Sequence, residues 1–355
     1  MSEIKELFLK LTEYTIPFGK EESLEPILPT GFKRDKIGNY YYEIGESETL
    51  FTTHLDTYSD KYEKVVHKFY KKDGTPCEKD EADIIATDGK TILGGDNKAG
   101  CTILINMINN KIPGVYYFFL GEEPILSGGV WGSTQALKAN PEYFKRFKRA
   151  IAFDRREMGS VITRQMARNC CSTEFTDAII KELAGQGLSF KKDPTGYYTD
   201  SGVFMDVIPE VTNLSAGVWN EHSPKEFCSI KYLEKVAEAA LHVNWESLPV
   251  VRKAFKNVPI KKGNFVTKFV DVKKTKKTFN IINNFLEMYG YLCINVEDYE
   301  PEHEMVFSQW HNESEIIIKF KDDSVIYEDQ EIPVKDFILM LDPEADLEEI
   351  FNPEK

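Results

Sequence analysis

Residues 114–123, GVYYFFLGEE, join an unbroken apolar run to two adjacent carboxylates. The run is rich in aromatic and β-branched residues and lacks polar alternation, which predicts a strand buried on both faces of a sheet. It is far shorter than the ~20 residues that a membrane span requires. The stretch therefore predicts the middle of a sheet, with acidic residues at the strand's end.

Glu122 and Glu123 follow this strand directly. Their carboxylates would repel each other there unless a cation lies between them or one of them stays protonated. A metal ion meets that need, with one glutamate as its ligand and the other as acceptor of a proton from water. An exposed loop, which Pro124 favours, is the alternative interpretation.

Outward from this stretch, similar apolar runs alternate with helix-like segments over the first 250 residues. The expected strands are 49–53, 114–120, 149–153 and 210–214, and the expected helices are 3–13, 98–110, 176–187 and 231–244. Alternation of this kind indicates an α/β layered domain, and the apolar strands indicate a sheet covered on both faces.

The composition is that of an ordinary globular chain and excludes disordered and collagen-like classes. The 355 residues include 44 Lys+Arg and 58 Asp+Glu, for a net charge of −14, and 42% are hydrophobic. This acidic balance argues against a nucleic-acid partner. No basic region followed by an apolar stretch begins the sequence, so a cytoplasmic location is expected. The six cysteines show no CxxC spacing and are expected to be free thiols.

The charge distribution predicts a domain boundary near residue 250. Residues 251–280 carry ten Lys+Arg and one acid, whereas residues 281–355 carry four Lys+Arg and twenty acids. We therefore expect a domain over 1–250 and a small α+β domain over 251–355, with a basic linker and an acidic tail. Within the second, a helix is expected over 279–289 and strands over 314–320, 324–328 and 331–338.

Histidines and acids recur where the expected strands end, which is where open α/β sheets place their sites. In the segment THLDT, His54 and Asp56 lie two positions apart, so both side chains of an extended strand face the same way. Asp56 would then accept a hydrogen bond from one ring nitrogen while the other binds a metal. Alone, such a pair is more often a hydrogen-bonded surface histidine.

Three further segments have the same character. In LGGDNKAG, residues 93–100, the glycines allow a turn, and Asp96 stands where a helix begins. A helix N-cap is the competing interpretation of Asp96. Asp154 follows the strand over 149–153, and His222 lies in a loop after the strand over 210–214. An aspartate or histidine in any one of these places more often has a structural role. The order of all five segments along the chain favours a functional site instead.

The succession of these segments over residues 45–230 resembles the two-zinc exopeptidases, a superfamily that includes peptidase T, glutamate-releasing carboxypeptidases and zinc aminopeptidases. The matching segments are His54-Leu55-Asp56, residues 95–100 (GDNKAG), Glu122-Glu123, Asp154 and residues 222–226 (HSPKE). The resemblance implies a three-layer αβα domain with a mixed central sheet. The loop after Glu123 departs from the pattern of this superfamily, in which glycine usually follows the Glu-Glu pair closely. Here residues 124–127 (PILS) come before Gly128-Gly129.

The resemblance implies that two zinc ions are held by His54, Asp96, Glu123, Asp154 and His222. His54 and Asp154 would bind one ion, Glu123 and His222 the other, and Asp96 would bridge them. Asp56 would orient His54, and Glu122 would be the general base. Nitrogen and oxygen ligands suit zinc, and they are equally compatible with cobalt or manganese.

The function implied is metal-dependent hydrolysis of a peptide bond. Peptidase T and the carboxypeptidases carry an inserted lid domain before the last histidine, but residues 155–221 are too few for one, which favours an aminopeptidase. Alternatives on the same fold are a carboxypeptidase, a deacylase of N-acyl amino acids, and a non-catalytic binding protein. A nucleic-acid binder acting through Lys253–Lys277 is a minority hypothesis. The sequence leaves open whether the protein forms a homo-oligomer.

Five other residues are candidates for the substrate pocket. Asp200 and Ser201 resemble a segment near the pocket in this family, although a turn is the alternative interpretation. Arg155, Arg156 and Arg164 would bind a substrate carboxylate or pair with the protein's own acids.

Overall fold

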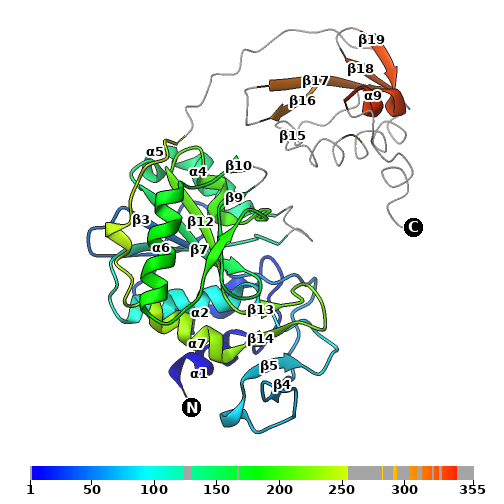
Figure 1. Ribbon diagram of the computed structural model, residues 1–355. Coiled ribbons are helices and arrows are strands. Elements are labelled where there is room, and N and C mark those ends of the chain that lie inside the picture. Colours follow the sequence, from blue (N-terminus) through cyan, green and yellow to red (C-terminus); the bar gives the residue numbers. More distant parts are fainter. Residues whose placement is uncertain are drawn as a thin grey trace. The chain divides into compact units, whose positions relative to one another are not determined.

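The computed structural model describes residues 2–123, 129–165, 168–254, 282, 291–293, 304–309, 314–321, 324–327 and 330–341. The chain divides into two compact units, Met1–Asn257 and Val258–Lys355 (Figure 1). Most of the helix expected over 279–289, the basic stretch from residue 255 to 277 and the loop 124–128 lie outside the described residues.

A mixed sheet of eight strands forms the centre of the first unit. In spatial order the strands are β1 (Lys33–Arg34), β2 (Tyr40–Ile44), β6 (Gly114–Phe119), β3 (Thr49–His54), β7 (Arg149–Arg155), β12 (Glu210–Ser215), β8 (Ser160–Ile162) and β11 (Lys191–Asp193). The four inner strands β6, β3, β7 and β12 run parallel to one another. Their carboxyl ends consequently meet at one edge of the sheet, as the sequence predicted for its apolar strands.

Alternate side chains of the inner strands pack on opposite faces of this sheet. Tyr117 and Phe119 of β6 contact the rings of Phe144 and Phe204 on one face. On the other face, Tyr116 stacks on Phe51 of the neighbouring strand β3, with the ring centroids 5.0 Å apart. All six residues of β6 and of β3 are buried, which explains why neither sequence shows polar alternation.

Helices cover the sheet on both sides, which confirms the predicted α/β class (Figure 1). Helix α2 packs against β3 and β7, with α1 and α7 beside it, and α4 packs against the 3₁₀ helix η3 on the other side. The helices of this unit are α1 (Glu3–Leu11), α2 (Gly95–Asn109), α4 (Trp131–Ala139), α5 (Pro141–Phe144), α6 (Thr173–Gly185) and α7 (Ile230–Ala239). The 3₁₀ helices are η1 (Glu21–Leu24), η2 (Lys79–Glu81), η3 (Asp200–Phe204) and η4 (Trp245–Ser247).

Helix α2 approaches β7 unusually closely because of a glycine. A Cβ atom on Gly100 would lie 2.5 Å from the backbone oxygen of Phe153 and 2.3 Å from Asn97 Oδ1. No real side chain tolerates such contacts without movement of the backbone. Gly100 therefore sets the distance between the start of α2 and the end of β7, where Asp96 and Asp154 lie.

A second, antiparallel sheet lies beside the edge where the carboxyl ends of the inner strands meet, and it carries His222, the last residue of the predicted site. Its strands, in spatial order, are β13 (Val218–Trp219), β14 (Phe227–Ser229), β5 (Ile84–Thr87) and β4 (His67–Tyr70). The loop from β13 to β14 contains His222. A two-stranded ribbon of β9 (Arg164–Gln165) and β10 (Arg168–Asn169) completes the described strands of the unit.

The described part of the second unit is an antiparallel sheet followed by a helix. The elements are β15 (Tyr291–Cys293), β16 (Glu304–Gln309), β17 (Ser314–Lys321), β18 (Ser324–Tyr327), β19 (Gln330–Pro333) and α9 (Val334–Leu341). The strand expected over 331–338 is wrong beyond Pro333. Val334, Phe337 and Ile338 are buried at helical spacing, so this segment buries one face as a helix and not as a strand.

Two further observations concern the helices and the cysteines of the described residues. Among the helices that the structure describes, none is both long and apolar enough to cross a membrane. Five cysteines are free thiols, namely Cys77, Cys101, Cys170, Cys171 and Cys228, and the sulfur atoms of the adjacent pair Cys170 and Cys171 lie 4.0 Å apart.

Candidate metal centre

Three parallel strands deliver side chains to the same edge of the central sheet. His54 is the last residue of β3, Asp154 lies near the end of β7, and Glu122 and Glu123 follow β6. Because these strands are neighbours and run in the same direction, their ends lie side by side. Residues that are up to 100 positions apart in the sequence are thereby brought into one cluster.

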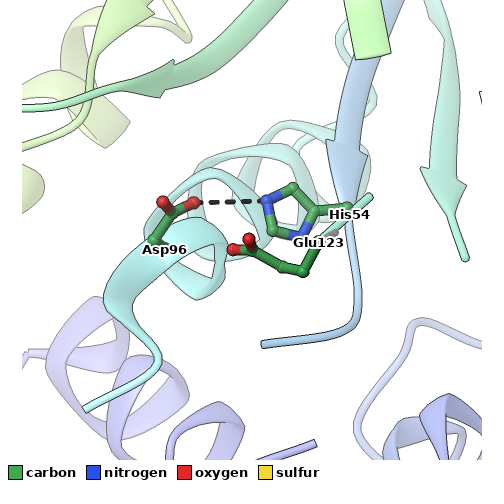
Figure 2. A group of neighbouring side chains, drawn as sticks. All are labelled: His54, Asp96 and Glu123. Atoms are coloured by element: carbon green, nitrogen blue, oxygen red, sulfur yellow. Dashed lines mark hydrogen bonds and ion pairs between the residues drawn. The ribbon is translucent and has the colours of Figure 1, made fainter. Parts of the chain in front are cut away.

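Asp96 lies between the two histidines of this cluster. Its Oδ1 is 3.2 Å from Nε2 of His54, and its Oδ2 is 3.3 Å from Nε2 of His222. Figure 2 shows the carboxylate of Asp96, at the start of α2, facing the ring of His54 at the end of β3, with the carboxylate of Glu123 beside them. Each oxygen of Asp96 thus faces a different imidazole.

The other acidic candidates flank this centre. Asp154 Oδ1 and Glu122 Oε2 lie 3.7 Å and 3.9 Å from His54 Nε2. Glu123 Oε1 lies 3.1 Å from His222 Nε2. The structure therefore brings together all five residues that the sequence predicted as metal ligands, along with the predicted base.

The helix-cap interpretation of Asp96 is not what the structure shows. Asp96 and Asn97 have non-helical backbone angles, and the regular part of α2 begins after them. The backbone N–H of Gly100 donates to the side-chain oxygen of Asn97 at 2.9 Å. Because Asn97 performs the capping, the carboxylate of Asp96 is left to face the histidines.

The donor set and its spacing fit divalent metal ions. Two groups, His54–Asp96–Glu123 and His54–Glu122–Asp154, each have donor atoms within 4.8 Å of one another. Ligand atoms at about 2.0–2.1 Å from a tetrahedral zinc ion lie about 3.4 Å apart, close to the contacts observed here. Asp154 Oδ1 is buried and makes no hydrogen bond within the described residues, although buried carboxylate oxygens ordinarily have a partner. A cation would supply that partner.

The electrostatics of the cluster point the same way. Burial raises the pKa of Glu122 well above its usual value and that of Asp154 to about 7, and in Asp154 the nearby charge of Asp96 adds to the rise. Burial alone would lower the pKa of His222, but the carboxylates of Asp96 and Glu123 outweigh it and raise that pKa to about 11. The carboxylate charges that act on Asp154 and His222 amount to an excess of negative charge in a buried site, which favours cations.

Asp56 lies behind His54, where its carboxylate has two tasks. His54 Nδ1 lies 3.2 Å from the backbone oxygen of Asp56 and 3.5 Å from its carboxylate Oδ1. The same carboxylate accepts the backbone N–H groups of Glu122 at 3.0 Å and Glu123 at 2.9 Å. Asp56 therefore faces the ring nitrogen that points away from the cluster and also holds the turn after β6.

Several supporting residues were not identified from the sequence. Thr199 Oγ1 donates to Asp154 Oδ2 at 2.5 Å, and the backbone N–H of Asp154 donates to Asn213 Oδ1 at 2.8 Å. The ring of Tyr58 stacks on His222, with centroids 4.3 Å apart. Their only sequence signal is adjacency: Thr199 precedes the predicted Asp200, and Tyr58 follows the HLD segment.

A cavity of about 220 Å³ adjoins the cluster. Its lining includes Asp96, Glu122, Asp154, Arg156, Tyr198 and His222. Lys98, which belongs to the same motif as Asp96, is fully buried and donates to the backbone oxygens of Leu55 and Asp56. It braces the loop behind the cluster and does not reach this cavity's lining.

Two of the three arginines considered for substrate binding pair with acids of the protein. Arg155 contacts Asp193 at 3.1 Å, and Arg156 contacts Glu221 at 3.2 Å, while Arg164 lies in β9. Asp200 and Ser201 begin η3, and both are buried. Ser201 accepts from Gln165 Nε2 at 3.2 Å and donates to the backbone of Thr212, which makes it part of the core.

No protein-family model matches the sequence, and no curated protein does so. Among solved structures, a tripeptidase from Staphylococcus aureus is similar at 15% identity and a TM-score of 0.53, over 68% of this chain and 96% of that chain. Aminopeptidase PepT from Bacillus cereus is 13% identical with a TM-score of 0.46, over 68% of this chain and 90% of its own. The Pyrococcus horikoshii TET1 peptidase is 18% identical with a TM-score of 0.47, over 68% and 100%. The likeness to the tripeptidase and the mixed eight-stranded sheet show that this chain shares the fold of that tripeptidase, the α/β fold that its sequence motifs predicted.

Proposed function

We propose that this protein is a metal-dependent peptidase that removes residues from the amino end of peptides, with two zinc ions in the cluster described above. The observation that carries the proposal is the position of Asp96, whose two carboxylate oxygens face two different histidines at 3.2 Å and 3.3 Å. A bridging carboxylate is what a pair of ions requires, since one side chain then neutralises charge at both.

The two sites would use different residues around Asp96. His54 and Asp154 would complete the first, and Glu123 and His222 would complete the second, in keeping with their contacts. When bound, the ions supply Lewis acidity, which polarises the scissile carbonyl and makes water acidic enough to attack near neutral pH. This mixture of histidine nitrogen and carboxylate oxygen donors suits zinc, cobalt and manganese alike.

Glu122 would move the proton in this reaction. Its carboxylate lines the cavity, and Oε2 lies 3.9 Å from His54, beyond hydrogen-bonding distance. Burial raises the pKa of Glu122 well above its usual value, which brings it closer to the working pH of a general base. Glu122 would accept the proton of the attacking water and pass it to the leaving nitrogen.

The chain architecture favours an aminopeptidase over a carboxypeptidase. Residues 155–221 belong to the first compact unit and supply β8 and β11 to its central sheet. The described residues between Asp154 and His222 thus build the central domain itself, which supports a chain without an inserted lid domain at this point. The shared fold of the Staphylococcus aureus tripeptidase is in keeping with a short peptide substrate.

The proposal is tested with a library of di- and tripeptides that are free or blocked at either end. Mass spectrometry would follow the products in the presence of chelator and after addition of zinc. Hydrolysis that needs a free amino end and returns with zinc supports the proposal. Release from the carboxyl end would make the protein a carboxypeptidase, and cleavage of N-acyl amino acids alone would make it a deacylase.

A further inference from the structure

The carboxylate of Glu226 makes a set of contacts that metal binding and proton transfer do not account for. Glu226 is 1% exposed and immediately precedes β14. Its Oε2 accepts the backbone N–H groups of Leu93 at 2.9 Å and Gly94 at 2.8 Å. Its Oε1 accepts the backbone N–H of Asp96 at 3.0 Å. One side chain thus holds three donors of the turn that presents Asp96.

The turn is shaped to admit this carboxylate. Gly94 has a φ of 73°, in the left-handed region that favours glycine. A Cβ atom on Gly95 would lie 3.1 Å from Glu226 Oε1 and 3.2 Å from the side chain of Val218. Any larger residue at position 95 would press on the carboxylate, so the paired glycines and Glu226 form one matched unit.

Glu226 is itself held firmly. The next residue, Phe227, pairs with Ala86 of β5 and Trp219 of β13, so the segment is part of the second sheet. Thr87 Oγ1 donates to the backbone oxygen of Pro224 at 3.3 Å. The segment from His222 to Glu226 therefore supplies one candidate ligand directly and ties down a second, Asp96.

We infer that Glu226 is a positioning residue that sets Asp96 between the two ion sites, an inference that rests on the proposed function. A carboxylate accepts hydrogen bonds on both oxygens, whereas an amide offers one acceptor and turns an NH₂ group toward the remaining donors. Bonds to an ionised acceptor are also the stronger ones. Replacement of Glu226 by glutamine would therefore release part of the turn and let the carboxylate of Asp96 move away from one histidine.

The test is a metal titration of Glu226→Gln. Metal-free protein is titrated with zinc against a competing chelator, and with cobalt, whose absorption reports the geometry of its ligands. Removal of a partner that orients a metal ligand typically weakens binding about 10–100-fold. We expect a loss of that size for Glu226→Gln, together with a changed cobalt spectrum, while the circular dichroism of the folded protein is retained.

Glu210 offers a matched control. It is fully buried and accepts the backbone N–H groups of Ser172, Val251 and Arg252, but it lies at the start of β12, at the end of the strands opposite the cluster. Glu210→Gln removes a similar buried carboxylate and should leave zinc affinity and the cobalt spectrum unchanged. An equal loss of affinity in Glu210→Gln would overturn the inference, because the effect would then be general loosening.

A second variant keeps the test decisive if Glu226→Gln does not fold. Gly95→Ala keeps the Glu226 side chain, but the added Cβ would push its carboxylate away from the turn over residues 93–96. This variant should therefore weaken zinc binding as Glu226→Gln does. If the wild type binds two ions and hydrolyses peptides, a folded variant with wild-type zinc affinity contradicts the role of Glu226. The proposed function is then unaffected. A wild-type protein that binds no ion contradicts the proposed function as well.

Discussion

Glu122 donates its backbone N–H to Asp56 Oδ1 at 3.0 Å, and this bond ties the candidate base to the residue behind His54. The adjacent N–H of Glu123 occupies the second oxygen of the same carboxylate at 2.9 Å. Asp56 is fully buried, so both bonds are shielded from water. The backbone at the end of β6 is consequently fixed independently of the glutamate side chains, and these can be altered one at a time.

Glu122→Gln should therefore remove catalysis without removing the ions. The backbone bond to Asp56 is retained, and the amide occupies the same space but cannot accept the proton of water. We expect kcat to fall by about 10²–10⁴-fold, the usual contribution of a general base. Steady-state kinetics and metal analysis of the same preparation check this. A variant that turns over at a near-normal rate would remove Glu122 from its assigned role.

Asp96→Ala should lose both metal and activity. Within the described part of the chain, only Asp96 has carboxylate oxygens that face both His54 and His222, so its removal should affect both ion sites. Asp35→Ala is the control, because Asp35 also accepts backbone N–H groups in a turn, those of Ile37, Gly38 and Asn39, but lies outside the cluster. Elemental analysis after dialysis should find metal in Asp35→Ala and none in Asp96→Ala. Full metal content in Asp96→Ala would contradict the bridging role.

The metal-free protein should become less stable as the pH rises, in part because of Asp200. Burial raises the pKa of Asp200 from 3.8 to about 8, with the charge of Asp154 adding to the rise. The folded state thus holds a proton that the unfolded chain releases, so stability is full below about pH 4 and is lost as the pH climbs through about 8. Asp200→Asn removes this ionisation.

Thermal unfolding in chelator measures the effect. At pH 8, Asp200→Asn should unfold at least about 2–4 °C above the wild type, the shift that 1 kcal/mol produces in a domain of this size. At pH 5 the advantage of the variant should be much smaller, because most of the interval between the unfolded and folded pKa values lies above that pH. A wild-type midpoint that rises from pH 5 to pH 8, or a variant with an unchanged pH profile, would contradict the assignment.

Gly100→Ala should destabilise the first unit. The added Cβ would lie 2.5 Å from the backbone oxygen of Phe153, which cannot move without shifting β7. Overpacking of this kind costs about 1–3 kcal/mol, measurable by denaturant unfolding. Gly185→Ala is the control within a helix, since nothing lies within 4 Å of its Cβ position. It should be neutral or stabilising. Equal stability of Gly100→Ala and the wild type would show that the helix and strand are less closely packed than described.

Strand composition and motif order were enough to predict the fold of the first unit and the membership of the cluster. Buried parallel strands such as β3 and β6 have no polar face, so their sequences are distinctive. The strand expected over 331–338 failed because a short apolar run fits a helix as well as a strand, and Pro333 ends the pairing there.

The supporting contacts were not predictable in the same way. Asn97 and Asp96 are neighbours of similar chemistry, and only the path of the backbone decides which one caps α2. Glu226 lies 133 positions from Leu93 along the chain, and their contact depends on how the second sheet meets the first. Glu226 belongs to the matching segment HSPKE, but a single sequence does not indicate which distant backbone groups its carboxylate holds.

The most direct test of the central claim is the metal content and peptide hydrolysis of the purified full chain, measured together. We predict two zinc ions per chain, cleavage from the free amino end of di- or tripeptides, loss of both metal and cleavage on chelation, and recovery of both on addition of zinc. A chain that binds no divalent ion, or one whose hydrolysis is unaffected when its metal is removed, would contradict the account.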